Sequence, residues 1–264
     1  MVEELIKIAN FLNKKEAKNV AVCYDGSEEA YVKKNLLEGY ILGEGINVVD
    51  CDICATNVLS TTVKKLEVDY GVSILENDLI IINSEGEIIK VNGEKEYILK
   101  SWKDIGEKEV RDANLIYQRE IFKILNSKNI EKHIILNLNF SPLFKVAPYI
   151  FRKIFKKVTT LNATNIKTIN DDPLAITKNL AKSYNADAAI IFDKYGFSLK
   201  ILINNEEVPS EKIFDKVKNA ILNGTLKDAE LKDIQFDNRL NSIKFTKFSK
   251  VYDSILTVLL FFLQ

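Results

Sequence analysis

Arginine is scarce in this sequence, and neither acidic nor basic residues are in excess. Only four of the 37 basic residues are arginine, at positions 111, 119, 152 and 239. Arginine is the better bidentate ligand for phosphate, so a phosphate-handling site has few of the usual side chains to use. The 37 acidic residues balance the basic ones, which excludes a global field that would attract nucleic acid or an anionic membrane surface.

Apolar runs long enough for a membrane span are also lacking. The strongly apolar segment 255–263 is well short of the roughly 20 residues that a helix needs to cross a bilayer. It predicts a buried helix or a docking surface, and no membrane span. A short tail anchor is the less favoured alternative, because the run ends at Gln264 without a basic flank.

Cysteine and histidine are few. The odd number of cysteines and the ordinary amphipathic start of the chain, with no signal peptide, favour a reducing, cytoplasmic location. Cys51 and Cys54 form a C-x-x-C, but a second pair of ligands and a strand-loop-helix redox context are missing. Small buried thiols are therefore the favoured interpretation. The single histidine, His133, precedes an apolar run and is expected to be a strand-entry residue.

Hydrophobic periodicity divides the 264 residues into two halves that alternate strands with helices. In the first half we expect helices at 1–14, 27–43 and 56–67, strands at 19–23, 47–49 and 70–75, and a hairpin at 78–99 that turns at 83–86. In the second half we expect strands at 134–138, 158–161, 188–192 and 198–203, and helices at 145–156, 173–184 and 210–222.

This alternation predicts an α/β fold of two tandem domains with mixed, mostly parallel sheets, one sheet in each half. The expected domains are 1–100 and 131–222. A charged helical connection containing Trp102 is expected at 101–130, and a C-terminal extension ending in an apolar helix at 223–264.

Several motifs in the first half follow one another in a recognisable order. Val20-Ala21-Val22-Cys23-Tyr24-Asp25-Gly26-Ser27 is followed by a helix, then by segment 48–56 and by Asp69-Tyr70-Gly71-Val72-Ser73-Ile74. This succession resembles the first domain of phosphohexomutases, enzymes that move phosphate between positions of a hexose. In that family the last segment enters a loop whose serine carries the exchanged phosphate. Here the chain passes through Leu75-Glu76 directly to Asn77-Asp78, so the resemblance implies a deleted serine loop.

The second half is similar to the second phosphohexomutase domain. Asn185-Ala186-Asp187-Ala188-Ala189-Ile190-Ile191-Phe192-Asp193 follows the family's approach to a loop in which three carboxylates hold magnesium. Only Asp193 remains, because Lys194-Tyr195-Gly196-Phe197-Ser198 adds no carboxylate. One carboxylate cannot replace three as ligands for Mg²⁺. We therefore expect no cofactor, with Mg²⁺ bound at Asp193 only if the family site is partly retained.

The candidate site residues are few. Ser73 is a weak candidate nucleophile, since it lies in an apolar strand with no loop to present it. Asp25 and Ser27 stand at the start of a helix, where backbone N–H groups can bind an anion. Thr56 follows a strand at the edge where ligands of open α/β sheets collect. Plain helix capping is the commoner role for all three residues. Lys194 is the remaining candidate ligand-binding residue.

Two functions from different classes remain open. The favoured one is a phosphohexomutase-like protein that is inactive as a mutase and acts as a binding or regulatory subunit, as a homo-oligomer or with a full-length mutase. The family's third and fourth domains, which bind the sugar and its phosphate, do not fit into the remaining residues. The alternative is an enzyme acting on a sugar phosphate through a re-formed site. A decayed gene product with a retained fold is a third possibility.

Overall fold

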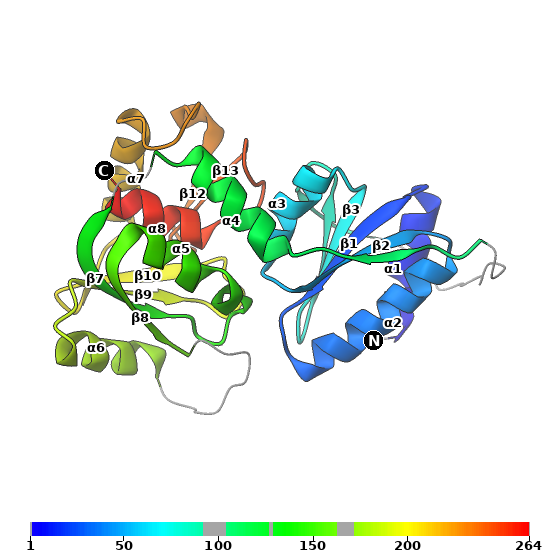
Figure 1. Cartoon of the computed structure of the whole chain (residues 1–264), viewed down its shortest axis with the longest axis horizontal. Helices are drawn as coiled ribbons and strands as arrows, with labels where there is room; N and C mark the ends of the chain where they lie inside the picture. Colours follow the sequence, from blue (N-terminus) through cyan, green and yellow to red (C-terminus); the bar gives the residue numbers. More distant parts are fainter. Residues whose placement is uncertain (1, 92–103, 127–128, 163–171, 264) are drawn as a thin grey trace. The chain divides into compact units, whose positions relative to one another are not determined.

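The computed structural model describes residues 2–91, 104–126, 129–162 and 172–263 (Figure 1). The chain divides into two compact units, Met1–Ile116 and Tyr117–Gln264. Each unit has its own mixed sheet with helices on both faces. Parallel pairings are three of five in the first sheet and two of four in the second, so the sheets taken together are mostly parallel, as the sequence predicts.

The first unit is built on a six-stranded sheet in the order β5-β4-β3-β1-β2-β6. Its elements are α1 (Val2–Lys14), β1 (Asn19–Tyr24), α2 (Glu28–Gly43), β2 (Asn47–Ile53), α3 (Thr56–Leu66), β3 (Tyr70–Ile74), β4 (Leu79–Asn83), β5 (Ile88–Ile89) and β6 (Lys108–Val110). β4 runs antiparallel to β3, whereas β2 and β3 are both parallel to β1.

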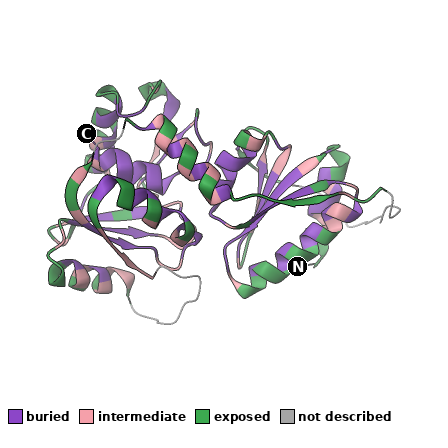
Figure 2. Cartoon of the chain, in the orientation of Figure 1, coloured by how far each residue is buried: buried purple, intermediate pink, exposed green. Residues whose placement is uncertain are grey.

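Alternating apolar residues give this sheet two buried faces. Val20 and Val22 of β1 share a core with α1 and α2, while Gly71 of β3 lies against Leu59 and Val63 of α3 on the opposite face. A Cβ on Gly71 would lie 2.6 Å from a methyl carbon of Val63, which explains why glycine occupies this close approach of strand and helix. Figure 2 shows the central strands as mostly buried, and in β1 and β3 only the first residue is not fully buried.

The connection between the two halves differs from the expected helix over 101–130. Trp102 lies outside the described residues, and Lys108–Val110 forms the edge strand β6, parallel to β2. Within the described residues of this stretch, 104–126 and 129–130, only Ala113–Ile124 is helical, as α4. The expectation was wrong at β6 because a three-residue charged strand has no periodicity of its own, and its pairing depends on distant residues of β2.

The second unit contains a five-stranded sheet in the order β11-β10-β9-β7-β8. Its elements are β7 (Ile130–Asn137), the 3₁₀ turn η1 (Pro142–Lys145), α5 (Ala147–Ile154), β8 (Phe155–Leu161), α6 (Pro173–Ser183), β9 (Ala188–Phe192), β10 (Leu199–Ile203), β11 (Glu206–Glu207), α7 (Ser210–Leu222), η2 (Leu231–Asp233), β12 (Ile234–Asp237), β13 (Ser242–Phe245) and α8 (Ser254–Phe262).

The C-terminal extension packs within this second unit. The amide of Leu199 donates to the carbonyl of Leu240 at 3.1 Å, which joins the β12–β13 hairpin to the main sheet. Every residue from Ser254 to Phe261 in α8 is buried, and Phe262 contacts Phe155 edge to face at 5.3 Å. Of the two sequence interpretations of this segment, buried helix and docking surface, the structure supports the first. No described helix is both long and apolar enough to cross a membrane.

Candidate functional site

Asp25 and Ser27 follow β1 and form one hydrogen-bonded unit. The Asp25 carboxylate is buried, and its Oδ1 accepts from the Ser27 amide at 2.9 Å and from the Ser27 hydroxyl at 2.7 Å. The Ser27 Oγ in turn accepts from the Ala30 amide at 3.3 Å and caps α2. The capping role considered for these residues is therefore present in the structure.

A tight turn stands where the resemblance places the serine loop. β3 pairs with β4 directly, and the Leu75 amide donates to the Asp78 carbonyl at 2.9 Å. The Glu76 amide donates to Oδ2 of Asp25 at 2.8 Å, and the Glu76 carbonyl accepts from Lys33 Nζ at 2.6 Å. Asp25 thus uses both carboxylate oxygens to hold the start of α2 and the tip of this turn together.

Ser73 and Thr56 are brought together, away from solvent. Both side chains are fully buried, and their hydroxyl oxygens are 2.9 Å apart. Thr56 is the first residue of α3, and Ser73 lies in β3 between its pairing partners Cys23 and Ile80. A hydroxyl in this position has no access to a substrate, so the geometry fits structural residues.

Asp193, in the second unit, accepts hydrogen bonds from the backbone of the loop that follows it. Its Oδ1 accepts from the Ser198 amide at 2.9 Å, and the Gly196 amide donates to its carbonyl at 3.2 Å. Burial raises the pKa of Asp193 above its ordinary value, while hydrogen bonds from the backbone amides of residues 195–198 partly offset that effect. The carboxylate is thus used as an internal acceptor for a turn of this loop.

The loop after Asp193 is packed on both sides. The Ser254 hydroxyl donates to the Gly196 carbonyl at 2.6 Å, and Gly196 has a positive φ of 81°. A Cβ at this glycine would lie 3.0 Å from the Leu143 side chain, so the close approach and the backbone conformation both favour glycine here. Lys194 Nζ lies 6.0 Å from the centre of the Tyr195 ring. Across the described residues, no three His, Cys, Asp or Glu side chains are grouped to hold a metal ion.

The three cysteines of the first unit are free and buried. The Cys23 Sγ donates to the carbonyl of Cys54 at 3.5 Å. Burial raises the pKa of Cys51 and of Cys54 well above the ordinary thiol value, so both are protonated near neutral pH. Their environment agrees with the interpretation of the C-x-x-C as small buried thiols.

His133 lies inside β7, as the fourth of its eight residues, so the expectation of a strand-entry residue was wrong because β7 already begins at Ile130. Its Nε2 is 3.0 Å from Oγ1 of Thr159, and its amide donates to Oδ2 of Asp187 at 2.7 Å. Burial, and after it the charge of Lys157, lower the pKa of His133 below its ordinary value. The imidazole is therefore neutral at pH 7 and braces β7 against β8.

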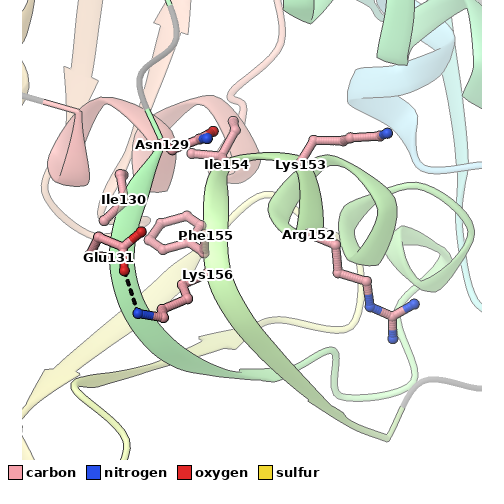
Figure 3. A pocket seen from close by; sticks show the side chains of 8 residues that line it. All are labelled: Asn129, Ile130, Glu131, Arg152, Lys153, Ile154, Phe155 and Lys156. Atoms are coloured by element: carbon pink, nitrogen blue, oxygen red, sulfur yellow. Dashed lines mark hydrogen bonds and ion pairs between the residues drawn. The ribbon is translucent and has the colours of Figure 1, made fainter.

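A surface pocket of about 160 Å³ lies at the start of β7 and β8 (Figure 3). It is lined by Asn129, Ile130, Glu131, Arg152, Lys153, Ile154, Phe155 and Lys156. Lys156 is paired with Glu131, and the side chains of Arg152 and Lys153 extend in different directions, away from that pair. This arrangement does not chelate a single small anion.

Sequence reasoning missed a partly buried ionic cluster and a buried hydrogen bond. In the first unit, Lys34 and Lys108 each contact both Glu38 and Asp50, at distances between 2.7 and 2.9 Å. In the second unit, Tyr117 donates to Asp253. Asn57, also overlooked, is fully buried, and neither side-chain polar atom has a hydrogen-bond partner in the described structure. The i, i+4 spacing of Lys34 and Glu38 on one helix was the only signal available in the sequence.

The chain is a two-unit α/β protein, and its likeness to known proteins is found both in sequence and in structure. Residues 3–76 match the family phosphoglucomutase/phosphomannomutase, alpha/beta/alpha domain I. This match covers 74 of the 264 residues, so it shows what the first unit is similar to. The resemblance recognised in the sequence is confirmed, and no curated protein sequence matches the chain.

Solved structures agree along nearly the whole chain. A protein assigned as a phosphomannomutase from Thermus thermophilus is 13% identical, with a TM-score of 0.75 over 98% of this chain and 74% of that one. A phosphoglucomutase/phosphomannomutase family protein from Burkholderia thailandensis is 12% identical, with a TM-score of 0.72 over 99% of this chain and 72% of that one. Parafusin, a phosphoglucomutase from Paramecium, is 12% identical, with a TM-score of 0.74 over 99% and 66% of the respective chains. At this identity the likeness establishes the fold.

Proposed function

We propose that this chain is a phosphohexomutase-like protein without mutase activity that acts as a binding or regulatory subunit. The observation that carries the proposal is the turn between β3 and β4. At the position where the resemblance places the phosphate-carrying serine, the Leu75–Asp78 turn is closed and held by Asp25, while Ser73 is buried against Thr56. Phosphoryl transfer needs a nucleophile within reach of its substrate.

The magnesium site supports the same proposal. Asp193 is the one retained carboxylate of the family loop, and it accepts hydrogen bonds from its own loop backbone. A magnesium ion requires several oxygen ligands in near-octahedral geometry. We therefore propose that the chain needs no magnesium and no other cofactor.

The binding role is proposed to involve a second copy of the chain or a full-length relative. Helix α8, one surface considered for this purpose, is buried within its own unit and does not offer an exposed face. A partner would use another surface. The three free thiols support the proposed cytoplasmic location, where cysteines remain reduced.

The rival function, an enzyme acting on a sugar phosphate, requires side chains whose hydrogen-bond donors or acceptors are available to the substrate. Asp25 and Asp193 direct their oxygens to backbone amides, and Thr56 is buried. These contacts favour the non-catalytic proposal over a re-formed site.

A thermal-shift experiment on the purified chain separates the two functions. Hexose 1-phosphates and 6-phosphates are added at millimolar concentration with and without MgCl₂. We expect no increase in Tm, because only a ligand that binds the native state raises stability. An increase of several degrees with one sugar phosphate, absent with inorganic phosphate, would favour the rival.

A further inference from the structure

The strand β8 lies at the edge of the second sheet, within a long stretch of sequence that has no acidic residue. Residues 132–170 contain no aspartate or glutamate and seven lysine or arginine residues, although the whole chain has a net charge of zero. The described part of this segment forms most of β7 together with η1, α5 and β8. Six of the seven basic residues lie in the described part, and all six are exposed: Lys132, Lys145, Arg152, Lys153, Lys156 and Lys157. This segment therefore carries positive charge at the surface that the overall charge conceals.

The backbone of β8 has one unpaired side. β8 is the last strand in its sheet and pairs only with β7 among the described strands. The Leu161 carbonyl accepts from the Leu138 amide, so Leu161 and the alternate residues Thr159 and Lys157 direct their backbone groups toward β7. The N–H and C=O groups of Lys156, Val158 and Thr160 therefore point outward, where an added strand would bind.

The basic side chains lie on both sides of this edge. Lys156 and Lys157 are exposed, and as neighbours in a strand they project to opposite faces of the sheet. Lys156 is paired with Glu131 at the surface, while Lys157 lies near His133. Arg152, at the end of α5, has no hydrogen-bond or ion-pair partner among the described residues.

The geometry points to a binding site for an extended acidic segment of a partner protein, which we propose adds to the sheet alongside β8. Main-chain hydrogen bonds to Lys156, Val158 and Thr160 would supply affinity. Adjacent acidic residues of the partner, which project to opposite faces, would contact Lys156 and Lys157 and determine specificity. This inference rests on the proposed binding role and names the surface and the partner chemistry for it.

Two other occupants fit less well. A small anion is disfavoured because Arg152, Lys153 and Lys156 do not converge in the pocket (Figure 3). A nucleic acid would use the positive charge but leave the outward N–H and C=O groups of β8 without a matching strand. Pairing of β8 with a second copy of β8 would bring two lysine pairs to one seam, and like charges there are destabilising.

The test uses the full chain and a fluorescein-labelled peptide of about nine residues, the length of a long strand, made of valine and threonine with two adjacent glutamates at its centre. Binding is measured by fluorescence anisotropy. Two competing probes are a peptide of the same sequence N-methylated at alternate residues, which keeps the charge and blocks strand pairing, and an oligothymidylate. We expect both to bind roughly tenfold more weakly than the peptide.

The variants are matched for charge. Lys156→Glu combined with Lys157→Glu should weaken peptide binding by roughly tenfold or more. Lys14→Glu combined with Lys15→Glu changes the net charge equally at two exposed lysines of the first unit and should leave binding unchanged. Hydrogen exchange should show new protection at the amides of Val158 and Thr160 when the peptide is bound, with Thr159 unchanged.

Four results would overturn the inference: no peptide binding, equal binding of the N-methylated peptide, tighter binding of the oligonucleotide, or an equal effect of both double variants. These results are distinct from failure of the proposed function. Mutase turnover with peptide binding intact would refute only the non-catalytic role, whereas absence of both turnover and peptide binding would refute only this surface.

Discussion

The hydroxyl oxygen of Tyr117 lies 2.9 Å from Oδ1 and 2.8 Å from Oδ2 of Asp253, and both side chains are fully buried. Asp253 Oδ1 also accepts from the Leu256 amide at 2.9 Å, which caps α8. The two residues are 136 positions apart in the sequence, so this contact ties the C-terminal helix to α4. It explains why the apolar end of the chain is part of the second unit.

Tyr117→Phe should destabilise the second unit by about 1.5–3 kcal/mol, because it removes a hydrogen bond to a buried charged group. Urea unfolding followed by circular dichroism measures the change. Tyr184→Phe is the matched control, since Tyr184 is 52% exposed. Equal stability of the two variants would show that the contact contributes little.

The same hydroxyl predicts a dependence on alkaline pH. Burial, and then the charge of Asp253, raise the pKa of Tyr117 well above its ordinary value. The stability gained from the neutral hydroxyl is therefore present below about pH 10, the ordinary tyrosine pKa, and is lost as the pH rises further. The difference in unfolding free energy between the wild type and Tyr117→Phe should shrink above that pH. A constant difference would contradict the assignment.

Asp193 should tolerate asparagine better than alanine. Asparagine keeps an oxygen to accept from the loop amides and removes a half-buried charge whose pKa is raised by burial, so we expect a loss below about 1 kcal/mol. Alanine leaves the Ser198 amide and its neighbours without their acceptor and should cost about 2–3 kcal/mol. Thermal unfolding with and without millimolar MgCl₂ checks both points. Stabilisation of the wild type alone by magnesium would indicate a retained metal site.

Asp50 links β2 to the edge strand β6. Burial opposes its ionisation, but hydrogen bonds from Lys108 and Lys34 outweigh that effect and hold the pKa of Asp50 below its ordinary value. The resulting stability is present above the ordinary value of about pH 3.9 and is lost as the pH falls through the lower, folded-state pKa.

Asp50→Asn should cost about 2 kcal/mol at pH 7, less than a fully buried pair, because Lys108 is partly exposed. The control is Asp215→Asn, whose carboxylate is 73% exposed. Chemical denaturation at pH 7 and near pH 3 should show the difference between wild type and Asp50→Asn shrinking in acid. A difference in unfolding free energy that grows in acid would contradict the lowered pKa of Asp50.

Local patterns made most of the fold predictable. The strand and helix alternation depends on apolar spacing within short windows, and Asn83-Ser84-Glu85-Gly86 carries its own turn chemistry, with Gly86 at a positive φ of 81°. Contacts between distant residues were not predictable in the same way. β6 and the Tyr117–Asp253 pair depend on partners 60 or more residues away, and a single sequence does not encode that proximity in any local signal.

For the candidate site, the sequence led mainly to expectations of absence. The resemblance implies a deleted serine loop and lost carboxylates after Asp193, because both interrupt a recognisable order of segments, and these stay predictions. The roles of the remaining side chains were not. Ser73 and Thr56 could be placed on neighbouring elements, but their hydrogen bond to each other depends on how α3 packs on β3.

The most direct test of the central claim is a coupled assay of phosphate transfer between positions of a hexose phosphate, using the purified chain with MgCl₂. A full-length phosphohexomutase serves as the positive control, and the chain with EDTA serves as the blank. We expect the purified chain to transfer phosphate at a rate indistinguishable from that of the blank. Magnesium-dependent turnover that persists through purification and scales with the concentration of the chain would contradict it.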